Sequence, residues 1–411
     1  MRRGVSASTS TGSVIAVMGV ALALMVMELS LAVSSGFKNE IERKVIGFDA
    51  PVTILPAYDY YTSTSESELQ AGDSLMDVIN DFLAYNNISE KTRVAPGFKR
   101  YAILKTDNDF LAVECLAHGD NHDFDFERRM MTEGSFPNIN DTAAPDSIVI
   151  SAPIARKLNL SPKDKAYLYF FVNDTPKARR VFVSGLYQSN FGEYDDAIIY
   201  TSMALLQGLG EGGATEATSI ALEGIEKEEI QPLSEALQQT LLGAYSRGEL
   251  SKAYPVTNVF HTGALFFNWL DLLDTNVIVI FILMICVSAF TLISSLFIII
   301  LDRVPTIGVL RSLGATRSQV SGIFMHLAMR LVGLGMIIGN VLALGLIFVQ
   351  NATHFLPLDP QMYYLAYVPF EISWMTVLWL NLGVAVGAWL ILILPARLAA
   401  RVDPASTMRY E

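Results

Sequence analysis

The residues best suited to recognition chemistry lie in the connection 301–320, LDRVPTIGVLRSLGATRSQV, between two long apolar runs. Three arginines and one acid stand in it: Arg303, Arg311, Arg317 and Asp302. Pro305 suits the first turn of a helix, where its missing N–H is not needed. Three apolar residues then recur at helical spacing: Ile307, Leu310 and Leu313. The pattern predicts a short amphipathic helix on the membrane face.

The end of this helix also has a sequence signature. Gly314 can adopt the left-handed conformation that ends a helix, and Thr316 with Gln319 matches the capping box that starts another. Two interpretations of the segment remain open on pattern alone. It either anchors the loop at the interface or docks into a groove on a partner outside the bilayer.

Catalytic chemistry has little support in the sequence. There is no GxxxxGK[ST] phosphate loop, and we find no Ser/His/Asp set or paired carboxylates at a suggestive spacing. The five histidines are scattered and do not suggest metal-ligand spacing. Cys286 lies in an apolar run and Cys115 in a polar region, so a disulfide between them is not expected. We therefore expect no catalytic residue, no metal site and no cofactor in this chain.

The composition indicates a membrane protein with a soluble domain. The chain has 411 residues, of which 52% are hydrophobic and 17% charged, and the mean hydropathy is +0.38. Soluble domains carry about 25% charged residues. Apolar runs of about 20 residues are long enough to span a bilayer. We expect an α+β membrane protein with four transmembrane helices and a large α+β extracytoplasmic domain inserted between the first and second.

The expected boundaries follow from the apolar runs. They are a short N-terminus 1–13, span 14–33, soluble domain with membrane-entry helices 34–276, span 277–301, connection 302–322, span 323–349, loop 350–374, span 375–394 and tail 395–411. A cleaved signal peptide is the alternative for the first apolar run. Its apolar core would normally be shorter, and no small-x-small site follows it cleanly, so we favour an anchor.

Glu28 lies inside the first predicted span. An acid there costs a few kcal/mol, so by default it marks a cavity or a partner. The alternative, slightly favoured here, is that Glu28 sits near the outer end of the span and reaches water. The chain then continues as a helix leaving the membrane, for which Gly47 is the expected stop.

The soluble domain shows alternating strands and helices. Strands are predicted at 52–55, 101–104, 111–115, 147–151 and 181–187, and helices at 75–85, 152–158 and 232–242. Residues 58–73 are rich in Ser, Thr and Glu and are expected to form a loop. Residues 265–273 form an amphipathic segment that would meet the membrane surface before the second span.

Basic residues predict the orientation. Eight arginines lie at the two ends and in the 302–322 connection: Arg2, Arg3, Arg303, Arg311, Arg317, Arg397, Arg401 and Arg409. The loop 350–374 has no Lys or Arg. By the positive-inside rule both termini and the connection are cytoplasmic. Set against Asp302, Asp403 and Glu411, the eight arginines leave +5 on the cytoplasmic side. Because the whole chain carries −12, the outer portion carries −17, which disfavours nucleic acid as a partner.

The segment Ile307–Ala315, IGVLRSLGA, resembles the IG(I/V)L(K/R)xLGA segment of FtsX-like, MacB-type ABC permeases. In that family it is the coupling helix that docks on the ATPase. The resemblance therefore implies an ATPase-coupling role for Arg303, Ile307, Gly308, Leu310, Arg311, Leu313 and Gly314. Many relatives have an acid just before the Ile-Gly pair, where this chain has Thr306, so any salt bridge of that acid is not carried over.

Further segments narrow the resemblance to the lipoprotein-releasing LolC/LolE family. They are SGFKNEIERKVIGF at 35–48, LDP at 358–360, YVPFEISW at 367–374 and the tail 395–410. The resemblance implies a permease subunit that extracts lipoproteins from the bacterial inner membrane for delivery to the outer membrane. It also places lipid chains between the first and second spans of two permease subunits, where Glu28 and Met25 are the candidate cavity residues.

The family further implies the partners. These are a cytoplasmic ABC ATPase dimer that binds ATP and Mg²⁺, a second permease subunit (a copy or a paralogue), lipoproteins, membrane lipids and a periplasmic carrier. The alternatives are a MacB-like tripartite efflux permease and an FtsX-like signal transducer controlling a cell-wall hydrolase.

In the family's carrier-recruiting subunit, a hairpin of the outer domain bears a long loop, the hook. The matching hairpin here has strands at 167–172 and 179–183 and a connection, NDTPKA, of about six residues, an ordinary loop length. We therefore expect no hook, and Lys177, Arg179 and Arg180 give at most a weak rim contact or are merely solvated.

Overall fold

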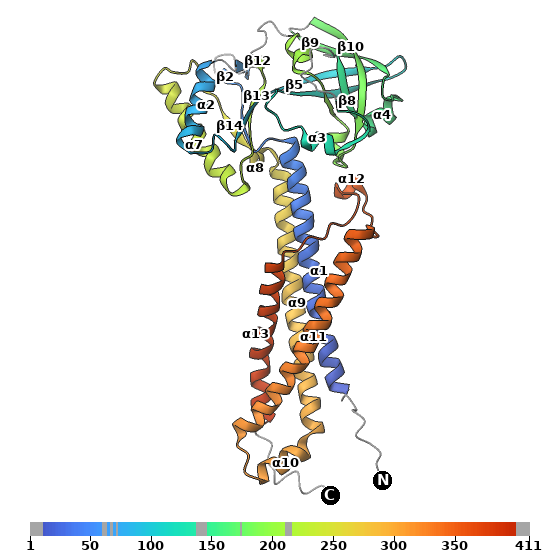
Figure 1. Cartoon of the computed structure of the whole chain (residues 1–411), viewed down its shortest axis with the longest axis vertical. Coiled ribbons are helices and arrows are strands. Elements are labelled where there is room, and N and C mark those ends of the chain that lie inside the picture. Colours follow the sequence, from blue (N-terminus) through green and yellow to red (C-terminus); the bar gives the residue numbers. More distant parts are fainter. Residues whose placement is uncertain are drawn as a thin grey trace. The chain divides into compact units, whose positions relative to one another are not determined.

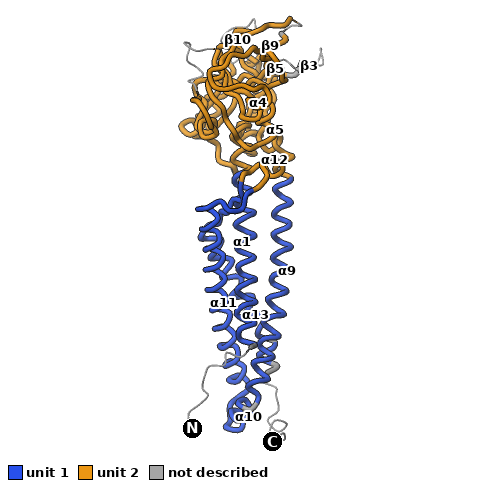
Figure 2. Tube along the Cα trace, turned by 90° about the vertical axis from the view of Figure 1, so that its right-hand side faces the viewer, with its two compact units in different colours: residues 1–40, 269–357, 367–411 blue, residues 41–268, 358–366 orange. Residues whose placement is uncertain are grey.

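The computed structural model of the chain describes residues 11–59, 64–65, 69–70, 73–136, 146–172, 175–209 and 216–399. The terminal segments, including Arg2, Arg3, Arg401, Arg409 and most of the tail, lie outside these ranges. The chain divides into two compact units (Figure 2). The helical unit holds residues 1–40, 269–357 and 367–411, and the soluble unit holds residues 41–268 and 358–366.

Four helices are long and apolar enough to cross a membrane. They are α1 (Thr11–Phe48), α9 (Ala264–Asp302), α11 (Arg317–Thr353) and α13 (Trp374–Ala399), and α10 (Val304–Ser312) connects α9 to α11 (Figure 1). Each extends past its predicted span at both ends. About 20 residues suffice to cross the hydrocarbon, so the remaining turns extend beyond it. The amphipathic segment 265–273 is not a separate entry helix, because it forms the first turns of α9.

The helical unit packs through small residues and a buried apolar cluster. A Cβ added to Gly19 of α1 would lie 2.5 Å from the side chain of Thr291 of α9, so the two helices approach closely there. The α11 and α13 helices also pack along one another. The cluster joins residues of all four long helices and of α10, including Val20, Leu296, Ile307, Phe324 and Leu392.

The soluble unit is built on one ten-stranded mixed sheet in the order β14-β1-β13-β5-β6-β11-β8-β10-β7, with β9 pairing both β10 and β5. Its strands are β1 (Val52–Ile54), β5 (Arg93–Lys105), β6 (Phe110–His118), β7 (Met131–Gly134), β8 (Ser147–Ser151), β9 (Lys165–Val172), β10 (Thr175–Tyr187), β11 (Ile198–Tyr200), β13 (Ser219–Glu223) and β14 (Val256–Asn258). Two small sheets pair β2 (Tyr58–Asp59) with β3 (Thr64–Ser65) and β4 (Leu69–Gln70) with β12 (Glu216–Ala217).

Two groups of helices accompany the sheet. The α2 helix (Asp73–Tyr85) packs on α7 (Lys227–Ser246), which contacts β14 (Figure 1). The shorter helices are α3 (Asp125–Arg129), α4 (Ala152–Leu158), α5 (Gly192–Asp195), α6 (Met203–Gln207), α8 (Val259–Thr262) and α12 (Pro360–Tyr363). One apolar core, which includes Phe98, Leu104, Ile150 and Phe170, lies between the sheet and α4 and α6. The predicted fold class is confirmed.

Local signals fixed several boundaries of the soluble unit. The β8–α4 junction falls where the sequence places it, because the Ser151 side chain accepts a hydrogen bond from the N–H of Ile154 and Pro153 suits the first turn. Two predictions are wrong. Residues 58–73 contain three short strands among their described residues, and α7 starts five residues before Pro232.

Gly47 was predicted to end α1 in a left-handed conformation. It lies inside the helix instead. An added Cβ there would come within 2.4 Å of the ring of Phe126. The glycine is therefore explained by the close approach of an aromatic ring and not by a change of backbone conformation.

Candidate functional site

The C-terminal end of α10 and the start of α11 show the interactions that the sequence predicts. Gly314 has a φ of +96°, and its N–H donates a hydrogen bond to the carbonyl oxygen of Arg311. The N–H of Ala315 donates one to the carbonyl oxygen of Leu310 at 3.0 Å. This is a Schellman motif. Thr316 and Gln319 then form the predicted capping box of α11. The three elements α9, α10 and α11 are therefore joined by turns with defined hydrogen bonds.

The two faces of α10 differ from the prediction. Ile307 is 2% exposed and belongs to the buried cluster of the helical unit, and Gly308 is also buried. Leu313 is 80% exposed and Val309 is 59% exposed. Ile307 and Gly308 therefore cannot contact a partner directly as the unit stands, and the prediction that Ile307 faces the ATPase is wrong. Its burial instead fixes α10 on the bundle.

The exposed face of α10 carries an apolar pair with basic neighbours. Val309 was not among the predicted contact residues, although a spacing of four places it on one face with Leu313. Arg303 is exposed, and Leu310 and Arg311 are partly buried. An apolar pair flanked by arginines suits a partner groove with an apolar floor and acidic rims.

Glu28 does not reach water, contrary to the alternative that we favoured. Its side chain is 0% exposed, and its Oε1 accepts a hydrogen bond from the side-chain amide of Asn381 of α13 at 3.3 Å. The amides of Asn381 and Asn340 of α11 also exchange hydrogen bonds of 2.8 and 2.9 Å. Oε2 of Glu28 has no hydrogen-bond partner among the described residues. A polar cluster thus joins α1, α11 and α13 inside the bundle.

This cluster was not predicted from the sequence, where neither Asn340 nor Asn381 was identified as a site residue. Glu28 follows Ala21 and Leu24 at helical spacing, and all three are buried. The acid therefore lies on the face of α1 that packs against other helices. Polar residues inside membrane spans usually face the bundle interior, which is the signal that would have paired the two asparagines with Glu28.

An apolar cavity of about 390 Å³ lies among α1, α9 and α13. Its lining is almost entirely apolar: Val20, Met27, Phe281, Ile285, Ser288, Leu292, Trp379, Leu380, Gly383, Val384, Gly387, Ala388 and Ile391. Its volume falls in the range of ligand pockets, about 300–1,000 Å³. Neither Glu28 nor Met25 lines this cavity, to which α1 contributes Val20 and Met27.

We expect Glu28→Gln to preserve the folded chain and Glu28→Ala to weaken it. Glutamine keeps an acceptor for Asn381 and removes a carboxylate oxygen that is buried without a partner. Alanine deletes the acceptor and leaves a void, and interhelical hydrogen bonds in membranes are worth about 0.6–1.7 kcal/mol. Thermal unfolding of the detergent-solubilised chain measures both.

The matched control for this prediction is Glu371→Ala, which removes an exposed acid of the same unit. It should leave the midpoint of unfolding unchanged. Equal losses of stability for Glu28→Gln and Glu28→Ala would contradict the prediction, because they would show that the charge itself is needed.

Comparison with known proteins shows what these features resemble. Residues 278–404, which contain α10, match the family described as FtsX-like permease C-terminal. The chain is 23% identical to the lipoprotein-releasing system transmembrane protein LolC of Xylella fastidiosa, over 97% of this chain and 94% of that protein. It is 26% identical to LolE of Haemophilus influenzae over 34% of this chain and 35% of that protein.

Two solved structures resemble the chain more distantly. The periplasmic region of MacB from Actinobacillus actinomycetemcomitans is 15% identical, with a TM-score of 0.34 over 56% of this chain and 98% of that one. The extracellular domain of YknZ is 13% identical, with a TM-score of 0.34 over 50% of this chain and 98% of that one. The chain therefore carries an FtsX-like permease C-terminal domain at 278–404 and is similar to LolC along nearly its whole length.

Proposed function

We propose that this chain is a permease subunit that extracts lipoproteins from the bacterial inner membrane for delivery to the outer membrane. The observation that carries the proposal is the likeness to LolC, a lipoprotein-releasing protein by name, across both units of the chain. Two features of the structure support it. The apolar cavity among α1, α9 and α13 suits a hydrocarbon chain, and α10 presents an exposed apolar pair.

The energy would come from a partner. ATP and Mg²⁺ would bind to a separate cytoplasmic ATPase dimer, and α10 would transmit its movement to the helical unit through Ile307. The arginines of α10 and of its flanks support a cytoplasmic position for this end of the bundle, because the loop 350–374 has none. The soluble unit would then be periplasmic, and a second permease subunit would complete the transporter.

Reconstitution tests this function. The chain, co-expressed with its ATPase, is placed in vesicles with a triacylated lipoprotein and a soluble acceptor protein for lipoproteins. We expect ATP-dependent appearance of the lipoprotein in the soluble fraction, and none with a hydrolysis-defective ATPase. Retention of the lipoprotein, together with ATP hydrolysis stimulated by an apolar peptide or an antibiotic, would overturn the proposal in favour of an efflux permease.

We further expect no carrier adduct at the β9–β10 hairpin. The register pairs Val172 with Thr175, so the connection shrinks from the predicted six residues to 173 and 174, whose structure lies outside the described residues. Lys177 donates a hydrogen bond to the carbonyl oxygen of Leu209, and Arg179 donates one to that of Gly208. The β9–β10 hairpin therefore has no long loop to which a carrier could bind.

A photo-crosslinking residue at Thr175 checks the expectation in cells that contain the carrier. The same residue at Tyr101, an exposed position of the sheet, provides the background. A strong adduct at Thr175 alone would restore a carrier-recruiting role to this subunit.

A further inference from the structure

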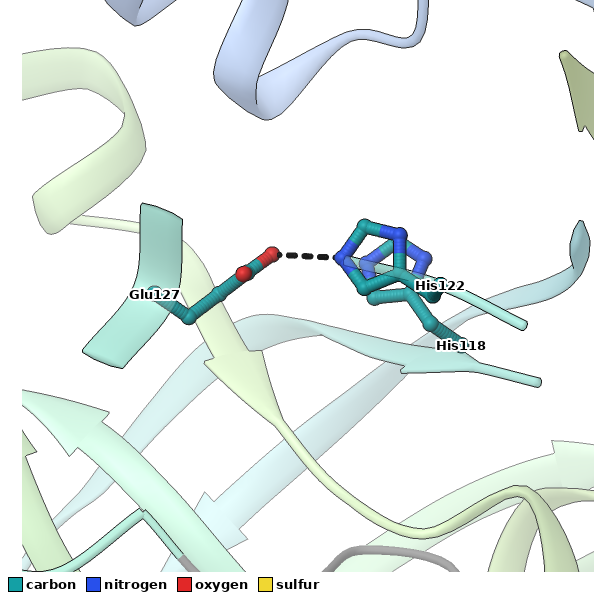
Figure 3. A group of neighbouring side chains, drawn as sticks. All are labelled: His118, His122 and Glu127. Carbon is teal, nitrogen blue, oxygen red and sulfur yellow. Dashed lines mark hydrogen bonds and ion pairs between the residues drawn. The ribbon is translucent and has the colours of Figure 1, made fainter. Parts of the chain in front are cut away.

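The soluble unit brings two histidines and a glutamate close together, although the five histidines of the chain as a whole are scattered in its sequence. His118 is the last residue of β6, His122 lies in the turn that follows, and Glu127 belongs to α3 (Figure 3). The three lie within ten residues of one another in the sequence, in the pattern H-x₃-H-x₄-E. Their placement follows from the tight path of the chain, in which the N–H of Gly119 bonds the carbonyl oxygen of Pro96 and the N–H of His122 bonds that of Gly119.

The ligand-forming atoms of these three residues converge. One nitrogen of each imidazole and one carboxylate oxygen of Glu127 all lie within 4.8 Å of one another. The two imidazoles stack with ring centroids 3.9 Å apart and planes 13° apart, and His122 Nε2 lies 2.9 Å from Glu127 Oε1 (Figure 3). Two nitrogens and one carboxylate oxygen are a ligand set typical of zinc sites with three protein ligands.

Glu127 shows that this group has unused binding capacity. The residue is 1% exposed, and its Oε2 makes no hydrogen bond with any residue that the structure describes. A buried carboxylate oxygen without a partner costs free energy, so such an atom calls for an explanation. A cation bound between the carboxylate and the imidazoles would provide one.

A second layer of contacts holds His122 in place. Its Nδ1 lies 2.5 Å from Oε1 of Glu223, the last residue of β13, and Oε2 of Glu223 accepts a hydrogen bond from the N–H of Asp123 at 3.2 Å. Metal-binding histidines almost always have their second ring nitrogen bonded to a carboxylate or carbonyl in this way. The ring of Phe124 packs against His122, and that of Tyr200 lies near His118, which limits the access of water.

An ion pair without a metal explains only part of this arrangement. Burial alone would lower the pKa of His122, but the hydrogen bonds and charges of Glu127 and Glu223 outweigh it and raise the pKa to about 9. A charged His122 between two glutamates thus accounts for its own two contacts. It does not account for the unpaired Oε2 of Glu127, nor for a second imidazole stacked on the first. Burial and then the charge of His122 lower the pKa of His118.

We propose that His118, His122 and Glu127 bind one divalent transition-metal ion of the zinc type, with Glu223 orienting His122. The site is independent of lipoprotein transport, because it stands on the soluble unit alone. The bound ion would tie the 119–124 turn and α3 to the end of β6, while Glu223 at the end of β13 orients His122. Three protein ligands leave one position for water or for a side chain of another protein.

The test uses the full-length, tag-free chain in detergent, stripped with a chelator and dialysed. We expect Zn²⁺ to bind with a stoichiometry of one per chain by calorimetry, and to raise the midpoint of thermal unfolding. His118→Gln and Glu127→Gln should each weaken binding at least tenfold, and Glu223→Gln should weaken it by about 10- to 100-fold as an outer contact. His261→Ala, which removes an exposed histidine of the same unit, should change nothing.

X-ray absorption of the zinc-loaded wild-type chain removes any dependence on the folding of the variants. Scattering from two imidazoles around the ion supports the site. A shell without imidazole, no saturable binding by the wild-type chain, or binding equally strong in His118→Gln and Glu127→Gln overturns it. Lipoprotein release is not measured in this test, so its result does not depend on the proposed function.

Discussion

Leu313→Asp should abolish binding of the proposed ATPase partner to this chain. Leu313, at the end of α10, is 80% exposed. It lies four residues after Val309, whose side chain is exposed on the same face. If this pair enters an apolar groove, the substitution buries a charge without a partner. Such a charge costs several kcal/mol, and each 1.4 kcal/mol is a tenfold loss of affinity. We expect the ATPase to be lost from the purified complex, and lipoprotein-stimulated ATP hydrolysis with it.

The matched control is Thr306→Asp, which adds the same charge to the first turn of the same helix. Thr306 is exposed, and a negative charge near a helix N-terminus is favourable. ATPase capture should survive this change and should also survive Leu313→Met. Wild-type recovery of the ATPase with Leu313→Asp would show that α10 does not dock through this face.

Ile307→Ala separates the two faces of α10. Because Ile307 is buried in the helical unit, its loss should lower the thermal stability of the chain itself, by the 2–5 kcal/mol typical of such core truncations. ATPase capture should then fall only as the folded fraction falls.

The sequence predicts where α10 ends and α11 begins, because both boundaries depend on hydrogen bonds between residues close together in the chain. Gly314, Thr316 and Gln319 act through hydrogen bonds within a few residues, and all three behave as predicted. The direction of the apolar stripe was wrong at Ile307. An amphipathic pattern says that one face avoids water but not whether the bundle or a partner covers it.

Features that depend on distant contacts were the ones the sequence did not reveal. Glu28 is buried, and its hydrogen-bond donor, Asn381, lies far along the chain. The β5 strand is 13 residues long, against four predicted, because β13, β6 and β9 each pair with part of it. His118, His122 and Glu127 are an exception, since their spacing within a turn and a short helix is local and was visible in the sequence.

Gly339→Leu should disrupt the helical unit. Gly335 and Gly339 of α11 lie directly against α1 of the same chain, so these glycines serve packing within the chain. A Cβ at Gly339 would lie 2.8 Å from the carbonyl oxygen of Ala21 and 3.2 Å from Cβ of Leu24. The backbone of α1 cannot rotate away as a side chain could, so the two helices must separate. Overpacking of this kind typically costs 1–3 kcal/mol and sometimes more.

Gly345→Leu is the control on the same helix, because nothing lies within 4 Å of an added Cβ there. It should fold at least as well as the wild-type chain, since leucine favours the helix by nearly 1 kcal/mol over glycine. Size-exclusion profiles and thermal unfolding in detergent compare the two variants, with Gly339→Ala expected between them. Equal stability of Gly339→Leu and Gly345→Leu would mean that the packing of α1 on α11 does not rely on the close contact at Gly339.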